Sequence, residues 1–123
     1  MHIWHRSNAE YFEPPGHFGG LHLANIVTRE LGANFSIQES VAPPGAGGHS
    51  HHHEAEAQLF LVIKGVLTFD TGSDRFTLHE GEAVLFQPFE PHATVNEGAG
   101  DSVSLVVTVT TPGRPGQGRR GED

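Results

Sequence analysis

The chain has 123 residues, which is the length of one domain with one core, and it contains no cysteine. The absence of cysteine excludes disulfides, thiolate metal sites and cysteine nucleophiles, so any metal must be held by nitrogen and oxygen ligands. A formal net charge of −8, with only seven lysines and arginines, excludes a basic groove for nucleic-acid phosphates.

We expect no export signal and no membrane-spanning segment in this sequence. The amino-terminal stretch MHIWHRSNAE lacks the apolar core of a signal peptide, and no window approaches a membrane span. We therefore expect a cytoplasmic protein with no membrane partner and no nucleic-acid partner. From residue 112 onward the sequence has no apolar residue, so we expect one domain over residues 1–111, with an N-terminal strand extension, and a disordered tail over residues 112–123.

Short apolar runs with a period close to two follow one another along the chain. The strands that this pattern predicts are, in chain order, residues 21–27, 34–42, 58–63, 66–70, 75–79, 81–86, 92–95 and 102–110. Between them, PPGAGG (43–48) and TGSD (71–74) are expected to be turns, and QPFEP (87–91) a loop. No segment has helical periodicity over more than a turn or two. Short strands punctuated by Gly and Pro predict an all-β sandwich or barrel.

Four of the ten histidines lie within five residues of each other, just before a hydrophobic run. His51 and His53 are two residues apart, so on a strand they would point to the same face. Gln58 lies five residues further on, so residues 54–57 must bend or bulge the chain before it can face the same way. His92 follows a proline-stiffened turn, and inward residues of neighbouring strands converge inside a barrel. Three imidazoles suit Zn, Fe, Ni, Cu or Mn and leave positions open for substrate.

These residues carry a resemblance to the cupin superfamily. The first cupin motif, G-x5-H-x-H-x3,4-E-x6-G, is matched in every spacing by Gly45, His51, His53, Gln58 and Gly65. The second, G-x5-P-x-G-x2-H-x3-N, falls with its spacing preserved on Gly81, Gln87, Phe89, His92 and Asn96, where Gln87 replaces the proline and Phe89 the glycine. The match spans about residues 45–96. The resemblance implies a single-domain jelly-roll barrel, or double-stranded β-helix.

The resemblance also implies a metal site. Its ligands would be His51, His53, Gln58 and His92, and the ion one divalent transition metal, Zn or Ni as isolated, with Fe or Mn as alternatives. Family members usually carry a glutamate where this chain has Gln58. A neutral amide beside three neutral imidazoles would leave the ion its full charge, which favours an anionic ligand such as an enolate or a carboxylate. The opposite interpretation is that Gln58 marks a decayed site.

A three-histidine, one-glutamine cupin resembles polyketide cyclases and unsaturated-sugar isomerases. We therefore expect a metal-dependent enzyme that acts on a small enolisable or aromatic molecule, in a homodimer. One alternative is a quercetinase-type dioxygenase that uses a redox-active metal, and another is a non-catalytic module that binds or senses a small ligand. A substrate carboxylate held by arginine is poorly supported, because only Arg6, Arg29 and Arg75 precede the tail.

Other side chains near the motifs are ambiguous from sequence. His52 has the opposite parity to His51 and is expected to point outward, whereas His49 shares its parity and is either a rim residue or an additional ligand. Glu54 and Glu56 are expected to be solvated, with a base as the alternative for Glu56. His17, His22 and His79 are expected to be ordinary surface or packed histidines, with His17 also a candidate to cover the pocket mouth. Phe60, Phe86 and Phe89 are expected to be core residues, with lining of a cavity as the alternative for any one of them.

Overall fold

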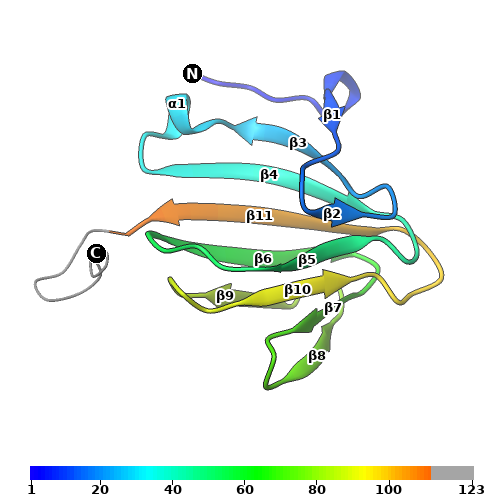
Figure 1. Ribbon diagram of the computed structural model, residues 1–123. Coiled ribbons are helices and arrows are strands. Elements are labelled where there is room, and N and C mark those ends of the chain that lie inside the picture. Colours follow the sequence, from blue (N-terminus) through cyan, green and yellow to red (C-terminus); the bar gives the residue numbers. More distant parts are fainter. Residues whose placement is uncertain (112–123) are drawn as a thin grey trace, which may run out of the picture.

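The computed structural model describes residues 1–111, and its regular structure is almost entirely antiparallel strands (Figure 1). The strands are β1 (Tyr11–Phe12), β2 (His17–Phe18), β3 (His22–Val27), β4 (Phe35–Ala42), β5 (Gly47–His51), β6 (Glu56–Lys64), β7 (Leu67–Asp70), β8 (Arg75–Leu78), β9 (Ala83–Phe86), β10 (His92–Val95) and β11 (Ser102–Thr110). Two single turns of helix, η1 (Arg6–Asn8) and α1 (Arg29–Gly32), complete the described elements. The tail expected at residues 112–123 lies outside the described residues.

The strands form two sheets that face each other. One sheet has the order β1-β3-β4-β11-β6-β9 and the other β2-β5-β10-β7-β8. In Figure 1 the second sheet lies in front of the first, and consecutive strands such as β5 and β6 fall in different sheets. This crossing between sheets is the jelly-roll arrangement. The all-β, jelly-roll class expected from the sequence is therefore confirmed.

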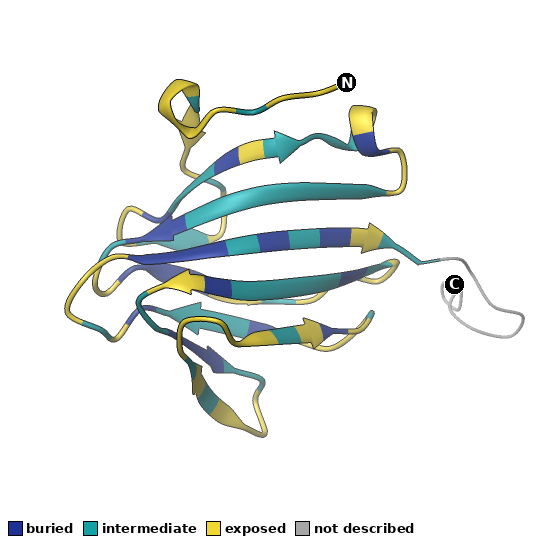
Figure 2. Cartoon of the chain, turned by 180° about the vertical axis from the view of Figure 1, so that it is seen from behind, coloured by how far each residue is buried: buried dark blue, intermediate teal, exposed yellow. Residues whose placement is uncertain are grey.

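β11 is one of the two central strands of the larger sheet. It pairs with β4 from Ser102 to Val109 and with β6 along nearly its whole length. Figure 2 shows that most of β11 is buried or half-buried, whereas the strands at the edges carry more exposed residues. A strand in this position carries side chains from one end of the interior to the other, so it can line a cavity along its length.

Two expectations for residues 43–53 were wrong. The turn expected over residues 43–48 ends earlier, because Gly47 and Gly48 belong to β5 and pair with Val95 and Thr94. A Cβ atom on Gly47 would lie 2.0 Å from the Thr94 carbonyl oxygen, so only glycine permits this close approach. The second error concerns His53, which lies beyond the end of β5 and is therefore not on the same strand as His51.

The main hydrophobic core fills one end of the sandwich. It consists of Val62, Leu67, Phe69 and Phe86, with Phe60 and Phe76 among the half-buried residues packed against it. Phe86 is thus a core residue, as expected by default, while Phe60 contacts both this core and the interior space beside it. A small cluster of Leu21, Ala42 and Ala46 closes the interior elsewhere. The volume between these clusters is where a cavity remains.

Two of the motif residues have structural roles. Asn96 is 1% exposed and donates hydrogen bonds to the carbonyl oxygens of Ala42 (2.7 Å) and Gly100 (2.8 Å), so it ties two turns together. Gly65 has a φ of +75°, and a Cβ atom there would lie 2.5 Å from the Asp101 carbonyl oxygen. Both positions therefore serve the fold and not the chemistry of a site.

The outer face of the larger sheet is apolar. Gln58 and Val106 line the interior, so the next residue on each strand points outward, and the pairing aligns Ile37, Val107, Leu59 and Leu85 in one row across four strands. Leu85 is 49% exposed and Ile63 on the same sheet 54%. The homodimer expected from the sequence stays a prediction, and this row is the surface on which a second copy would be sought. Within residues 1–111 no helix is long and apolar enough to cross a membrane.

Candidate functional site

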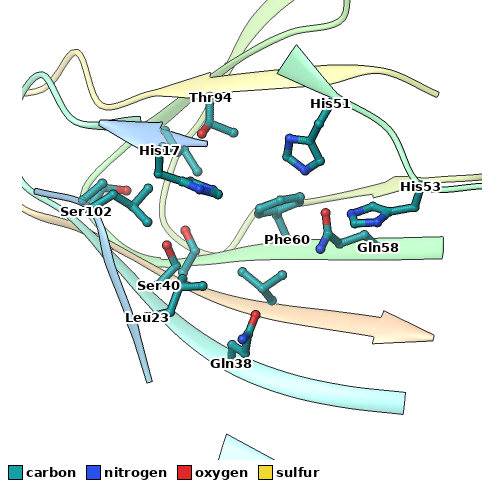
Figure 3. Close-up of a pocket in the computed structure, with 15 residues that line it drawn as sticks. His17, Leu23, Gln38, Ser40, His51, His53, Gln58, Phe60, Thr94 and Ser102 are labelled. Carbon is teal, nitrogen blue, oxygen red and sulfur yellow. The ribbon is translucent and has the colours of Figure 1, made fainter. Parts of the chain in front are cut away.

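A cavity of about 160 Å³ lies between the two sheets. Strands from both sheets line it, with His17, His51 and Thr94 on one side and Gln58, Phe60 and Ser104 on the other. Figure 3 shows His51, His53 and Gln58 grouped at one end of this space, and Ser40 and Ser102 at the other. The cavity is thus polar at both ends, and it is the setting for the residues that the sequence singled out.

The structure brings the four expected ligands together from separate elements. His51 ends β5 and is paired directly with His92, which begins β10, and Gln58 lies on β6 of the facing sheet. The imidazole centroids of His51 and His92 are 4.6 Å apart, those of His51 and His53 5.2 Å, and those of His53 and His92 6.4 Å. That these residues bind a metal stays a prediction, but their spacing in sequence does correspond to proximity in space.

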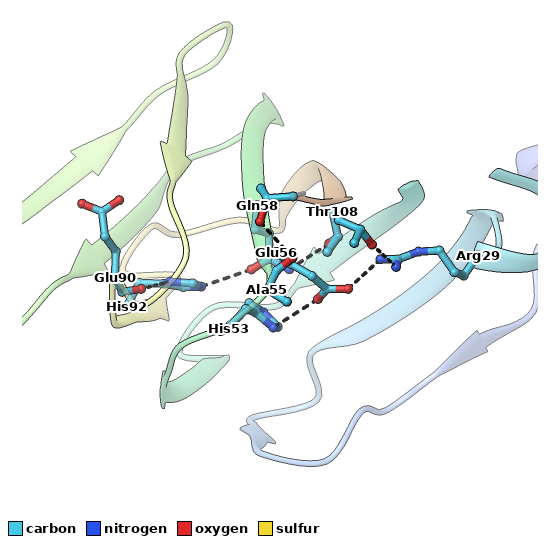
Figure 4. Close-up of polar contacts among 10 residues, drawn as sticks. Arg29, His53, Ala55, Glu56, Gln58, Glu90, His92 and Thr108 are labelled. Atoms are coloured by element: carbon cyan, nitrogen blue, oxygen red, sulfur yellow. Dashed lines mark hydrogen bonds and ion pairs between the residues drawn. The ribbon is translucent and has the colours of Figure 1, made fainter. Parts of the chain in front are cut away.

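In each of the three imidazoles, Nδ1 faces an oxygen of the protein. The His51 Nδ1 donates to the carbonyl of His49 at 3.0 Å, and the His92 Nδ1 lies 3.3 Å from the carbonyl of Glu90. The His53 Nδ1 contacts the Glu56 carboxylate at 3.4 Å (Figure 4). A proton held on Nδ1 in this way leaves the lone pair on Nε2, which is the arrangement that outer-shell partners impose on metal-binding histidines.

His92 lies between two acceptor oxygens, because its Nε2 is also 3.2 Å from the Gln58 Oε1. A neutral imidazole carries one N–H, so it can donate to only one of the two. A cation held by Nε2 and Oε1 would remove the conflict, because both atoms would then act only as electron-pair donors. The Gln58 Nε2 donates to the Thr108 hydroxyl at 3.1 Å, which holds Oε1 toward the ring. A site without an ion would favour the reversed amide.

Burial keeps the His92 ring neutral. The side chain is 1% exposed, and burial, followed by the neighbouring His51 imidazole, lowers the pKa of His92 to about 4. The ring is therefore uncharged at pH 7, so its Nε2 lone pair is available without loss of a proton. It is held rigidly, because it stacks on Phe86 with the ring centroids 4.2 Å apart and the planes at 13°.

One further atom fits a ligand role. The Nε2 of His53 is buried and has no hydrogen-bond partner among the described residues, although the Glu56 contact fixes the other side of the ring. As the side chains stand, no three His, Cys, Asp or Glu residues within residues 1–111 are arranged to hold a metal ion. Side-chain rotations that close the wide His53–His92 separation would be required. The donor set of three imidazoles and an amide oxygen nevertheless fits a borderline divalent ion.

Glu56 is not the solvated charge that the sequence suggested. It lies on β6, is half-buried, and accepts a hydrogen bond from the Arg29 guanidinium at 2.7 Å while its other oxygen faces His53 (Figure 4). Arg29 also donates to the Thr110 hydroxyl at 2.6 Å. The ion pair fixes Glu56, and Glu56 in turn orients the His53 ring. The alternation of residues along a strand could not reveal this ion pair, because Arg29 and Glu56 are 27 residues apart in the sequence.

We expect Glu56→Gln to weaken metal binding by about 10- to 100-fold, which is the range for partners that orient a metal-binding histidine. The amide would keep the size of the side chain but could present an N–H to the His53 Nδ1. Competition against a chromogenic chelator measures the affinity. Glu54→Gln is the matched control, because Glu54 is exposed and contacts His52 instead. Equal affinities in the two variants would mean that Glu56 does not orient a ligand.

The parity argument failed for His49. Pairing of β10 with β5 shifts between His92 and Thr94, so an extra β5 residue is accommodated there and the faces of His49 and His51 no longer match. His49 is exposed and packs against Phe18 at a centroid distance of 4.9 Å, which makes it a rim residue. His52 points outward as expected and stacks near Phe89. His17, expected by default to be an ordinary surface or packed histidine with the pocket mouth as the alternative, lines the cavity wall.

Phe89 occupies the position of the second motif glycine and has a φ of +72°. That value explains why glycine is usual there, because a side chain disfavours the left-handed region. The Phe89 backbone N–H donates to the His53 carbonyl at 2.6 Å, so this loop holds the segment that carries His53. Phe89 is exposed and is therefore neither a core residue nor a cavity-lining one.

Several polar residues of the site were not singled out from sequence. Ser102, Ser104 and Thr108 alternate on β11, and all three are buried. The two serines line the cavity, and Thr108 holds the Gln58 amide. The signal was present in SVSLVVTVT, where the polar residues share one parity and the apolar residues except Val106 have the other, but alternation alone does not say which face is inside.

Comparisons with known proteins identify the family and support the fold. The model of the cupin domain family matches residues 39–109. No curated protein matches the sequence. Among solved structures, a predicted oxalate decarboxylase from Thermotoga maritima is 20% identical with a TM-score of 0.80, covering 88% of this chain and 98% of that one. The polyketide cyclase RemF from Streptomyces resistomycificus is 23% identical with a TM-score of 0.77, covering 89% and 79%.

A third similar structure, KdgF from Halomonas sp., is 17% identical with a TM-score of 0.73 and covers 89% of this chain and 95% of that one. At these identities the solved structures show a shared fold and nothing more. The family match is stronger evidence, because it covers more than half of the chain and includes both histidine motifs. The protein therefore belongs to the cupin domain family.

Proposed function

We propose that the protein is a metal-dependent enzyme that acts on a small enolisable or aromatic molecule. The observation that carries the proposal is the pair formed by His92 and Gln58, in which a neutral imidazole nitrogen and an amide oxygen face each other at 3.2 Å beside the cavity. His51, His53, Gln58 and His92 would hold one divalent transition-metal ion. Such an ion would act as a Lewis acid toward an oxygen of a bound molecule.

The charges around the site favour an anionic oxygen. All four proposed ligands are neutral when they bind. No ligand side chain would therefore offset the positive charge of the ion. Glu56 is separated from the cavity by His53 and is already paired with Arg29. An enolate or phenolate oxygen would therefore be stabilised more strongly here than beside a carboxylate ligand.

His17 offers a group that can move a proton. Its Nδ1 donates to the Pro15 carbonyl at 2.8 Å, which leaves Nε2 as the basic atom of a ring that lines the cavity. The ring centroid lies 6.2 Å from that of His51. We propose that His17 accepts the proton released when a bound molecule enolises. Apolar side chains such as Leu23 and Phe60 exclude water from the same space.

Similarity to the polyketide cyclase RemF supports a cyclase or isomerase among the metal-dependent reactions, although that similarity concerns the fold. The test is turnover of a panel of monocyclic enolisable ketones and phenols by metal-free protein and by Zn- and Fe-loaded protein. We expect turnover only with metal, and with Zn as well as Fe, in the absence of oxygen. Activity that requires both Fe and oxygen would favour a dioxygenase. Metal-dependent binding without turnover of any compound would favour a ligand-binding module.

A further inference from the structure

Two buried hydroxyl groups of the cavity wall have no partner within the described protein. Ser102 and Ser104 are 1% and 2% exposed, and neither Oγ atom makes a hydrogen bond to any described residue. Both residues line the cavity. A buried hydroxyl without a partner is unfavourable, and most such groups in folded proteins are satisfied. These two are therefore candidates to bond a molecule that enters the cavity.

The serines lie at the end of the cavity opposite His51, His53 and Gln58, and His17 is the histidine nearest to them (Figure 3). In Figure 3 the Ser40 and Ser102 hydroxyls project into the space at one end, and His51, His53 and Gln58 lie at the other. Ser104 is the direct neighbour of Ser40 across the β4–β11 ladder, which places it in the same group. The rest of the wall combines the apolar Leu23, Phe60 and Val106 with the polar His17, Gln38 and Thr94. A molecule with an apolar middle and oxygen atoms at both ends would complement this wall.

The charge and the volume of the cavity further restrict the class of molecule that could bind in it. The side chains that line the cavity include no Lys, Arg, Asp or Glu, so no permanently charged side chain is available there to pair with a carboxylate, a phosphate or an ammonium group. A hydroxyl both donates and accepts, which suits a neutral hydroxyl or carbonyl group. The volume of about 160 Å³ is close to that of a protein cavity of about 150 Å³ that holds one benzene ring.

We propose that Ser102 and Ser104 form a subsite for a neutral hydroxyl or carbonyl group on a molecule with a single six-membered ring. The oxygen atoms at the opposite side of the ring would lie at the His51, His53, Gln58 and His92 end. This inference rests on the proposed function and specifies its substrate class. It places monocyclic compounds inside the cavity and leaves no room to enclose a polycyclic one.

Two probes that differ by one group test the subsite. Catechol has adjacent oxygens for the metal end, and 1,2,4-trihydroxybenzene adds a hydroxyl on the far side of the ring. With Zn-loaded protein under argon, titration calorimetry should show that the added hydroxyl tightens binding by about tenfold, as one net hydrogen bond does. In the Ser102→Ala/Ser104→Ala variant this advantage should fall below about threefold, whereas catechol itself binds as in the wild type.

Stability separates a ligand-binding role from a structural one. Because the hydroxyls have no partner, metal-free Ser102→Ala/Ser104→Ala should unfold at the same temperature as the wild type or higher. Ser50→Ala, at an exposed position of β5, is the control for both measurements. A less stable variant that keeps the tenfold advantage would overturn the subsite, as would an absent advantage in the wild type when catechol binds. If neither probe binds Zn-loaded wild type, the proposed substrate class and the subsite both fail.

Discussion

Replacement of His92 by phenylalanine is expected to lower metal affinity by more than about 100-fold, because even the outer partners of metal ligands contribute 10- to 100-fold. His92 is 1% exposed and stacks on Phe86, so an alanine there would also leave a hole in the core. Phenylalanine keeps an aromatic ring against Phe86 and removes both nitrogens. Chelator competition measures the affinity, and chemical denaturation of the metal-free variant shows whether the fold is intact.

His51→Ala is expected to be nearly as damaging as loss of His92, because neither neighbouring histidine can replace it. His49 packs against Phe18 and His52 lies beside Phe89, so both face away from the cavity. His79→Ala is the control for loss of one histidine, since His79 is exposed and its ion-pair contact within residues 1–111 is with Glu82. If His92→Phe folds and retains wild-type metal affinity, the histidine cluster is not the metal site.

Gln58→Glu is expected to keep or tighten metal binding while turnover falls by about 10- to 100-fold. The carboxylate binds a cation more strongly than the amide, but it reduces the charge that remains to stabilise a developing enolate. A 10- to 100-fold loss corresponds to about 1.4–2.7 kcal/mol of transition-state stabilisation. The Thr108 hydroxyl can donate to the new carboxylate in place of accepting from the amide, so the fold should tolerate the change.

Gln58→Ala should instead lose metal affinity and turnover together. Gln38→Glu is a matched control, because it adds the same charge to the cavity wall at a glutamine that bonds Asn25 and no histidine. If the added carboxylate acts only by making the cavity more negative, and not as a metal ligand, Gln58→Glu and Gln38→Glu would reduce turnover equally. Unchanged metal affinity and unchanged rate in Gln58→Glu would show that this side chain does not contact the ion.

The strands could be predicted because polar and apolar residues alternate along them. The sequence did not show which face of each strand points into the interior. Along β4 and β11 most of the apolar residues point outward and the serines point inward, with Ala42 and Val106 as apolar residues that line the cavity, so the usual burial of an apolar face is largely reversed. The interior of this sandwich holds a cavity with polar ends, so the ordinary rule does not apply to it. A single sequence carries no record of that cavity, and for this reason Ser102 and Ser104 were not recognised as site residues.

The four candidate ligands could be selected from sequence because their spacing follows a family motif, not because parity located them. Parity misplaced His49, since a register shift in β5 separates it from the face of His51. It also treated His53 as a strand residue, whereas a loop contact from Phe89 holds it in place. The orienting pair of Glu56 and Arg29 joins residues far apart in the chain, and local patterns do not reveal such contacts.

The central claim is that the histidine cluster and Gln58 hold one metal ion, and elemental analysis of the protein as isolated tests it most directly. In chelator-free buffer we expect about one equivalent of Zn or Ni per chain, since these ions bind imidazole well and resist air oxidation. His92→Phe, prepared in parallel, should contain almost none, which separates the site from adventitious binding to the exposed His49 and His52. Wild-type metal content well below about half an equivalent, or equal content in the two proteins, would contradict the account.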